Sequence, residues 1–126
     1  MKIVYDSLMG KTEKFVRKTG FPHIKISPEL EVTEPFVLVT YTTGRGEVPE
    51  TTTNFLSSNH ANLVAVACSG HRNWGVHNFC KAGEIVAKKY KVPVLLKFEM
   101  VGSKTDVEKF IGGVLEIEKE LFGVQQ

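Results

Sequence analysis

The chain has 126 residues, 42% of them hydrophobic, and its 16 basic and 14 acidic side chains give a formal net charge of +2. This length favours a single domain over residues 1–126 with a hydrophobic core, and the apolar content argues against disorder. The lysines are spread among glutamates rather than gathered in the basic stripe typical of nucleic-acid-binding proteins, so no nucleic-acid partner is expected.

Apolar runs that alternate with amphipathic stretches predict strands and helices in turn. Proline marks several boundaries, because it cannot continue a helix and restricts the residue before it. Ser103, with Asp106 three residues later, is the expected N-cap of the last helix. The predicted strands are residues 2–6, 23–26, 36–42, 63–68 and 94–98, and the predicted helices are residues 11–19, 49–59, 78–90 and from 103 onward.

Strands that alternate with helices imply a parallel sheet with right-handed crossovers. Five strands fit a flavodoxin-like three-layer α/β sandwich with the strand order 2-1-3-4-5. Residues 27–34, between the second and third strands, are too short and too proline-interrupted for an ordinary crossover helix. We therefore expect this helix to be missing or reduced to a turn, and part of the sheet face near the first and third strands to be less covered than usual.

Three turn segments, residues 7–12, 40–46 and 69–75, directly follow three of the predicted strands. The carboxyl ends of parallel strands lie at one edge of the sheet, which is where open α/β sheets bind ligands. Together the turns offer hydroxyl groups, unpaired backbone N–H groups and one indole. That combination suits a flat aromatic ligand that carries a phosphate.

The first turn, SLMGKT, has the composition of a phosphate-binding loop. Helix N-termini leave backbone N–H groups unpaired and favour anions. Ser7 and Thr12 add hydroxyl donors, and Gly10 allows close approach to the backbone. The GxxxxGK spacing of a Walker A loop is absent. The same residues also suit a turn without a ligand, and this segment alone does not separate the two readings.

The other two turns can also be explained without a ligand. Gly44 and Gly46 bracket Arg45 and permit positive φ angles and peptide flips. They either present backbone groups to the edge of a ring or only turn the chain into the next helix. Trp74, in a polar and glycine-flanked loop, either stacks on a flat ligand or packs as a lid on the core. The joint placement of the three turns on one edge favours the ligand.

The remaining reactive side chains carry weaker signals. Cys68 and Cys80 form no CxxC pair, so reduced thiols are expected. Cys80 begins a predicted helix, where a thiol pKa can fall, although a small packed hydrophobe is the commoner role of cysteine. The histidines have no metal-binding spacing, so no metal site is expected.

The chain opens on strand-like residues and has no apolar run near the roughly 20 residues of a membrane span, so we expect a cytoplasmic protein with no membrane partner.

The residues of the three turns resemble those of one family. SLMGKT resembles the Ser/Thr-x-Thr-Gly-x-Thr phosphate loop of flavodoxins. YTTGRGEVP and SGHRNWG closely resemble segments of the NrdI family, the small flavodoxin-like activators of class Ib ribonucleotide reductase, and the resemblance covers essentially the whole chain. Two positions depart from the pattern: Met9 stands where a hydroxyl residue is usual, and His71 stands where asparagine is common.

The resemblance implies a bound flavin mononucleotide (FMN). Its phosphate would lie in residues 7–12, and its ring would lie between residues 41–46 and the 70–80 region. Gly44 would lie near the flavin N5, where its peptide carbonyl accepts a hydrogen bond made only in the reduced state and so tunes the potential. The implied cofactor-binding residues are Ser7, Leu8, Met9, Gly10, Lys11, Thr12, Tyr41, Thr42, Thr43, Gly44, Gly70, Asn73, Trp74, Gly75, Phe79 and Cys80.

The resemblance also implies a function. Members of the family are understood to reduce dioxygen at the flavin and to pass superoxide to the manganese-containing small subunit of class Ib ribonucleotide reductase. There the superoxide oxidises the dimanganese site and generates the tyrosyl radical. The implied partners are that small subunit, a flavin-reducing electron donor and dioxygen. Because the cofactor carries the chemistry, the protein is expected to be a redox activator rather than a classical turnover enzyme.

The alternatives to this function are four other classes of protein. A general flavodoxin electron carrier binds the same cofactor but serves reductases, and such carriers are usually strongly acidic, unlike this chain. A phospho-receiver domain needs paired acidic residues after the first strand, where Asp6 stands alone. A small tyrosine phosphatase needs C-x5-R, whereas Cys68 and Arg72 are too close for that motif. A non-enzymatic binding module would be excluded by bound flavin.

Overall fold

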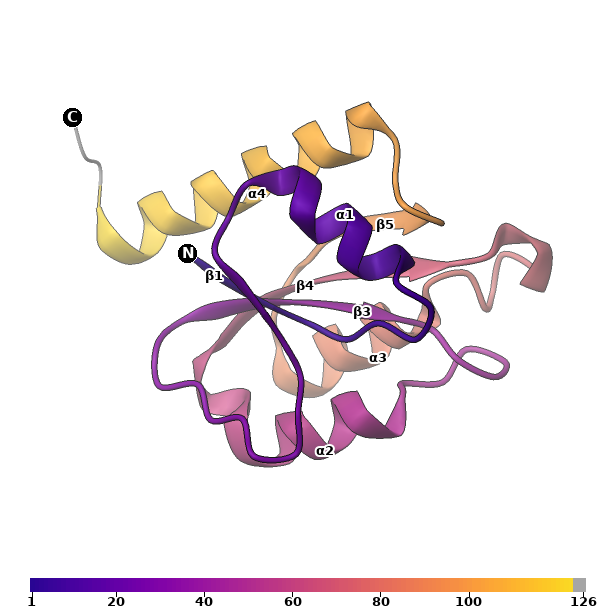
Figure 1. The fold of residues 1–126 in the computed structure, drawn as a ribbon, viewed down its shortest axis with the longest axis horizontal. Helices are drawn as coiled ribbons and strands as arrows, with labels where there is room; N and C mark the ends of the chain where they lie inside the picture. The colour runs from indigo at the N-terminus through magenta and orange to yellow at the C-terminus, as the bar shows by residue number, and fades with distance from the viewer. Residues whose placement is uncertain (124–126) are drawn as a thin grey trace.

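The computed structural model describes residues 1–123 and confirms the predicted order of the sheet. Five parallel strands run side by side in the order β2-β1-β3-β4-β5 (Figure 1). The strands are β1 (Lys2–Tyr5), β2 (His23–Lys25), β3 (Phe36–Tyr41), β4 (Leu63–Gly70) and β5 (Val94–Glu99). The helices are α1 (Lys11–Thr19), α2 (Glu50–Asn59), α3 (Lys81–Tyr90) and α4 (Lys104–Phe122), with short 3-10 helices η1 (His60–Asn62) and η2 (Arg72–Trp74).

Helices cover both faces of the sheet, because successive side chains of each strand point to opposite sides. In Figure 1, α1 and α4 lie on one face and α2 and α3 lie on the other. Ile3 packs in the first core with Phe110 of α4. The next residue, Val4, packs in the second core with Phe55 of α2 and Val86 of α3. The central strands are therefore buried on both sides, and their carboxyl ends are where they become accessible.

Residues 27–34 contain no helix, as predicted. The expectation that the sheet face here would be less covered is wrong for the strands themselves, because Val4 and Leu38 are fully buried. Leu30 and Val32 take the place of the missing helix by packing on the same apolar cluster. The segment still leaves a pocket of ≈ 340 Å³ between itself and α2.

Strand β4 is longer than predicted. It was expected to end at Cys68 but extends to Gly70. Ser69 pairs with Tyr41 of β3 on one side and with Phe98 of β5 on the other. The first residues of the third turn segment therefore belong to the edge of the sheet, and only the later ones form a loop.

Helix α3 begins later than predicted, at Lys81. Residues 76–80 form turns, and Cys80, just before the helix, has a left-handed φ of 54°. Phe79 therefore lies outside the helix. Ile85 of this helix is exposed to solvent, whereas Val86 is buried.

The last helix begins at the predicted cap. The Ser103 hydroxyl accepts a hydrogen bond from the Asp106 N–H (3.1 Å), and the Asp106 carboxylate accepts one from the Ser103 N–H (2.9 Å). Val107, Phe110 and Val114 face the core. None of the helices in residues 1–123, α4 included, has the length and apolar character needed to cross a membrane.

Asn59 anchors the segment before β3 to α2, and replacing it with alanine should destabilise the fold. Its side-chain oxygen accepts a hydrogen bond from the Val32 N–H (2.9 Å), and its amide donates to the Leu30 carbonyl (3.3 Å). Asn59→Ala leaves the buried Val32 N–H unpaired, so we expect the free energy of unfolding, measured by urea denaturation, to fall by about 2 kcal/mol. Ser57→Ala, at an exposed position of the same helix, should change it by less than about 0.5 kcal/mol. Equal losses in the two variants would contradict the anchoring role.

Candidate functional site

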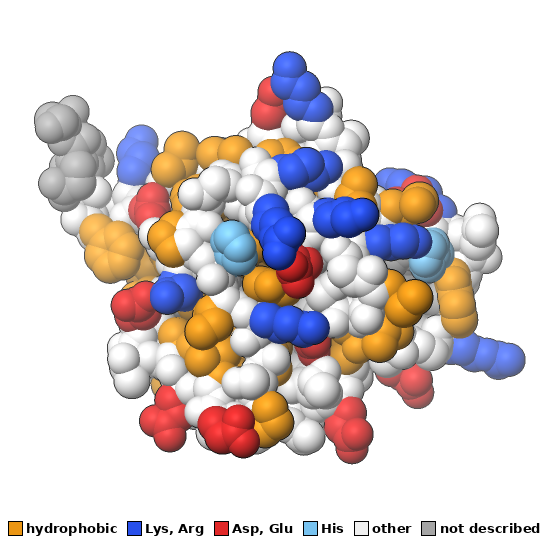
Figure 2. Space-filling view, in the orientation of Figure 1, with side chains coloured by type: hydrophobic (Ala, Val, Ile, Leu, Met, Phe, Trp, Pro, Cys, Tyr) orange, Lys and Arg blue, Asp and Glu red, His pale blue; other side chains and the backbone are white. Residues whose placement is uncertain are grey.

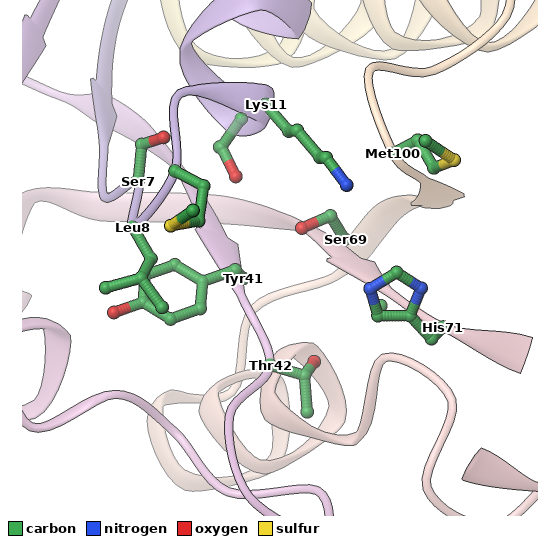
Figure 3. Close-up of a pocket in the computed structure, with 11 residues that line it drawn as sticks. Ser7, Leu8, Lys11, Tyr41, Thr42, Ser69, His71 and Met100 are labelled. Atoms are coloured by element: carbon green, nitrogen blue, oxygen red, sulfur yellow. The ribbon is translucent and has the colours of Figure 1, made fainter. Parts of the chain in front are cut away.

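The loops after β1, β3 and β4 meet at one edge of the sheet and form a groove. A first pocket of ≈ 170 Å³ lies between the loop after β1 and the ends of β4 and β5 (Figure 3). A second pocket of ≈ 280 Å³ lies against the loop after β3. Leu8, Tyr41, Thr42 and His71 line both pockets, so the two form one continuous groove, which we call the rim groove.

The loop after β1 and the start of α1 line the first pocket. Gly10 has a left-handed φ of 86°, and its N–H donates to the Ser7 hydroxyl (3.0 Å), which closes the turn. Helix α1 then begins without a side-chain cap, and its first residues, Lys11 and Thr12, line the pocket. A Cβ added to Gly10 would meet no atom within 4 Å, so the turn borders open space. An uncapped helix N-terminus beside an open pocket is a favourable site for an anion.

Basic side chains lie along α1, and one of them reaches the first pocket. The Lys11 side chain points into the first pocket (Figure 3). Lys14 and Lys18 are exposed on the same helix, together with Arg17, which pairs with Glu13. Figure 2 shows Lys and Arg side chains gathered over the face that carries α1. The charge of Lys11 adds to the helix dipole in favouring an anionic ligand, whereas Arg17 and Lys18 lie in the last turn of α1.

The loop after β3 is a tight hairpin. The Thr43 N–H donates to the Glu47 carbonyl (2.9 Å), and the Glu47 N–H donates to the Thr43 carbonyl (2.7 Å). Gly44 and Gly46 have left-handed φ values of 58° and 101°. A Cβ at Gly46 would lie 2.9 Å from the Cβ of Lys81, so this position has no room for a side chain. The hairpin places Gly44 on the wall of the second pocket.

The loop after β4 carries the single tryptophan and is held by Arg72. The Arg72 N–H and guanidinium both donate to the Glu99 carboxylate at the end of β5 (2.8 and 2.6 Å). The guanidinium also lies over the Phe79 ring, 4.4 Å from its centre, and the Asn78 amide donates to the Trp74 carbonyl (3.2 Å). Trp74 is half exposed and lines the second pocket, so its indole is available to a flat ligand.

Large apolar side chains at this edge of the sheet are exposed to solvent rather than packed. They come from the loops after β1, β4 and β5. Exposed apolar patches of this kind mark binding or docking surfaces. We call these residues the apolar rim: Leu8, Met9, Trp74, Val76 and Met100, with exposed fractions from 49% to 85%.

The two cysteines are free thiols buried behind the groove. The Cys80 thiol donates to the Cys68 carbonyl (3.1 Å), and a Cβ on Gly70 would lie 2.8 Å from the backbone nitrogen of Cys80. A hydrogen bond with the Cys68 thiol, and then burial, raise the pKa of Cys80. The suggestion of a lowered thiol pKa at Cys80 is therefore wrong, and the side chain acts as a small packed hydrophobe.

Predicted residues from all three loops line the rim groove, and a smaller group does not. The members of the second group shape the loops or lie behind them. The predicted residues that line the groove are Ser7, Leu8, Met9, Lys11, Thr12, Tyr41, Thr42, Thr43, Gly44, Gly70 and Trp74. Those that line neither pocket are Gly10, Asn73, Gly75, Phe79 and Cys80.

Several residues that line the groove are missing from the predicted set. Gly46, Ser69 and His71 belong to the three turn segments, where composition alone does not separate lining residues from supporting ones. Asn78 lies in a turn that the sequence pattern predicts as helix. Met100 follows β5 at the same edge, so the strand-end rule identifies it once it is applied to the fifth strand.

The sheet order, together with the uncapped N-terminus of α1 at the strand ends, defines a flavodoxin-like protein. Among solved structures, the chain is similar to a short-chain flavodoxin associated with a bacterial microcompartment, with a TM-score of 0.68, 20% identity and coverage of 91% of this chain and 95% of that one. It is also similar to a Fusobacterium nucleatum flavodoxin bound to flavin mononucleotide, with a TM-score of 0.61, 17% identity and coverage of 94% and 96%.

Sequence comparison identifies the family. The family model described as "NrdI Flavodoxin like" matches residues 3–112. The chain is 51% identical over 111 residues to Protein NrdI of Bacillus licheniformis, covering 87% of this chain and 84% of that protein. It is 42% identical over 120 residues to Protein NrdI of Macrococcus caseolyticus, covering 94% and 92%. The chain therefore belongs to the NrdI family, as its turn segments predict.

The Arg72–Glu99 contact should make the loop after β4 sensitive to acid. The Arg72 N–H, and then its guanidinium, hold the pKa of the Glu99 carboxyl below its usual value. A carboxyl with a lowered folded-state pKa stabilises the loop above its usual pKa of about 4.3, and this effect is lost as the pH falls through the folded-state value. We expect the fluorescence of Trp74 to change in a step below about pH 4. Glu99→Gln should remove the step, and a step that persists in Glu99→Gln would contradict this assignment.

Proposed function

We propose that this chain binds FMN in the rim groove and reduces dioxygen to superoxide, which assembles the dimanganese–tyrosyl radical cofactor in the small subunit of a class Ib ribonucleotide reductase. One observation carries the proposal: a single groove combines an uncapped helix N-terminus with a pocket walled by Tyr41 and Trp74, in a chain of the NrdI family. The similar flavodoxin that holds flavin mononucleotide supports the choice of ligand.

The groove has the chemistry that FMN needs at each end. The N-terminus of α1, the Lys11 ammonium and the hydroxyls of Ser7 and Thr12 match the phosphate. The second pocket, with Tyr41 and Trp74, offers flat apolar surfaces to the ring. When bound, FMN supplies the electron transfer and the reaction with dioxygen, which the side chains of the groove do not provide.

Gly44 is the residue that we expect to tune the potential. It lines the second pocket, and its φ of 58° lies where glycine is free to reorient its peptide. If turned toward the ring edge, its carbonyl would accept a hydrogen bond from a ring N–H of reduced FMN. Such a bond favours the reduced form by about 1 kcal/mol, or about 40 mV for a one-electron step.

The apolar rim is where the reductase small subunit would dock. Leu8 and Met9 flank the opening of the groove on one side, and Trp74 and Val76 lie in the loop on the other. Docking there removes apolar surface from water and places the partner at the mouth from which the oxidant leaves. The electron donor has to reach the same opening, so the two partners would bind in turn.

Reductive titration tests the function, followed by exposure to oxygen with the manganese-loaded small subunit of a class Ib reductase. We expect a yellow protein, superoxide on reoxidation, and a tyrosyl radical in the electron paramagnetic resonance spectrum. A metal-free small subunit is the control and should give no radical. Bound FMN without radical formation would favour a general flavodoxin electron carrier, the second candidate, which the fold similarity supports. A protein that binds no flavin would contradict both functions.

Gly44→Val should shift the flavin potentials. The left-handed φ of Gly44 is unfavourable for a branched side chain, so the substitution changes the backbone of the hairpin. We expect a change of tens of millivolts in a potentiometric titration. Arg45→Ala, which truncates an exposed side chain in the same hairpin, should leave the potentials nearly unchanged. Unchanged potentials in Gly44→Val would remove Gly44 from this role.

A further inference from the structure

Asp6 is a buried carboxylate that the proposed chemistry leaves unused. It is 5% exposed and stands between β1 and the turn of residues 7–12. Its N–H donates to the Val39 carbonyl (2.9 Å), which ties it to β3. One of its carboxylate oxygens accepts hydrogen bonds from the hydroxyls of both Thr51 and Thr52 (2.7 Å for Thr52). Asp6 thus joins the turn of residues 7–12 to the start of α2.

The two threonines belong to the first turn of α2, which begins at Glu50 and has no side-chain cap of its own. A carboxylate at a helix N-terminus is stabilised by the helix dipole. In residues 1–123, the ion pairs join basic groups to other carboxylates and not to Asp6. Asp6 therefore places next to the rim groove a negative charge that is stabilised by hydroxyl groups and by a dipole.

Tyr41 carries the influence of this charge into the groove. Burial, and then the Asp6 carboxylate, raise the pKa of the Tyr41 phenol, while hydrogen bonding with the Thr51 hydroxyl opposes them. Thr51 donates to Asp6, and Tyr41, which feels the charge of Asp6, lines both pockets. The Thr52 hydroxyl lies 3.0 Å from that of Thr40, which fixes the end of β3 to the same helix turn.

We propose that Asp6 is a positioning residue of the rim groove: through the first turn of α2 it fixes the end of β3, where Tyr41 lines the groove, and it sets beside Tyr41 a negative charge that disfavours an electron-rich ligand. The inference rests on the proposed FMN function. Reduced flavin carries more negative charge than oxidised flavin, and a nearby charge of the same sign raises its free energy.

The phosphate of FMN does not obscure this effect. It meets the same Asp6 charge in both redox states, so its contribution cancels when the affinities for reduced and oxidised FMN are compared. Only the ring changes its charge between the two states. Asp6 therefore weakens the binding of reduced FMN relative to oxidised FMN and lowers the potential, which makes the protein a stronger reductant of dioxygen.

Asp6→Asn tests the charge, since asparagine keeps the shape of the side chain and an oxygen acceptor for the threonines. We expect the ratio of the dissociation constants for reduced over oxidised FMN to fall about threefold or more, with a rise in the flavin potential. Glu116→Gln removes a carboxylate from an exposed position of α4 and changes the net charge equally. Its ratio should match that of the wild type. Equal ratios in Asp6→Asn and Glu116→Gln would overturn the proposal.

Thr51 provides a second variant in case Asp6→Asn does not fold. Thr51→Val removes the hydroxyl that donates to Asp6, and Thr51→Ser keeps it. In flavin-free protein the Tyr41 phenol can be titrated by its absorbance and separated from Tyr5 and Tyr90 with a Tyr41→Phe variant. We expect Thr51→Val to raise the pH at which Tyr41 titrates and to change the FMN ratio, and Thr51→Ser to restore both. No change in either measurement with Thr51→Val would overturn the positioning role.

The flavin-free titration separates the failure of this inference from the failure of the proposed function. In Asp6→Asn, Tyr41 should titrate at lower pH, because the neighbouring negative charge is gone. Suppose that the wild-type protein binds no FMN, but Tyr41 still titrates at lower pH in Asp6→Asn than in the wild type. That result would overturn the FMN function while supporting the coupling of Asp6 to Tyr41. A normal FMN-binding protein with neither a Tyr41 shift nor a changed ratio would overturn the role of Asp6 alone.

Discussion

The parallel pairing of β3 between β1 and β4 is the constraint on which the rim groove depends. Val39 of β3 lies opposite Tyr5 of β1 and Ala67 of β4, so the three strands reach one edge together. A slip of one residue would exchange the side chains packed under α1 and α4 with those under α2 and α3, and both cores oppose it. The loops are thus brought together by the packing of the sheet, before any contact among the loops themselves.

The ends of the strands and the tips of the loops differ in how firmly they are held. The ends of the strands are held by buried polar contacts, such as those of Asp6 and Thr52, and by the close approach of Gly70 to Cys80. The tips of the loops instead present large apolar side chains to water and keep backbone N–H groups free of side-chain caps. Trp74 combines both properties: its backbone carbonyl accepts a hydrogen bond from Asn78, while its indole is exposed.

Local patterns predict much of this architecture. The strand order, the absence of a helix over residues 27–34 and the Ser103 cap all follow from short stretches of sequence. The start of α3 does not, because the left-handed conformation of Cys80 goes with a close contact to Gly70 that exists only in the folded chain. The partners of Asp6 lie 45 and 46 positions away, so no spacing rule predicts the contacts that support the groove from behind.

The burial of both cysteines makes their thiols natural probes of local opening in this part of the fold. Neither thiol exposes surface in the folded state, so an alkylating reagent reaches either one only when β4 separates from the segment around Cys80. The rate of alkylation under native conditions therefore measures how often this part of the core opens, without any added probe. Because the sequence has no other cysteine, a thiol engineered onto the surface would be the sole attachment point for a dye or spin label while the protein stays folded.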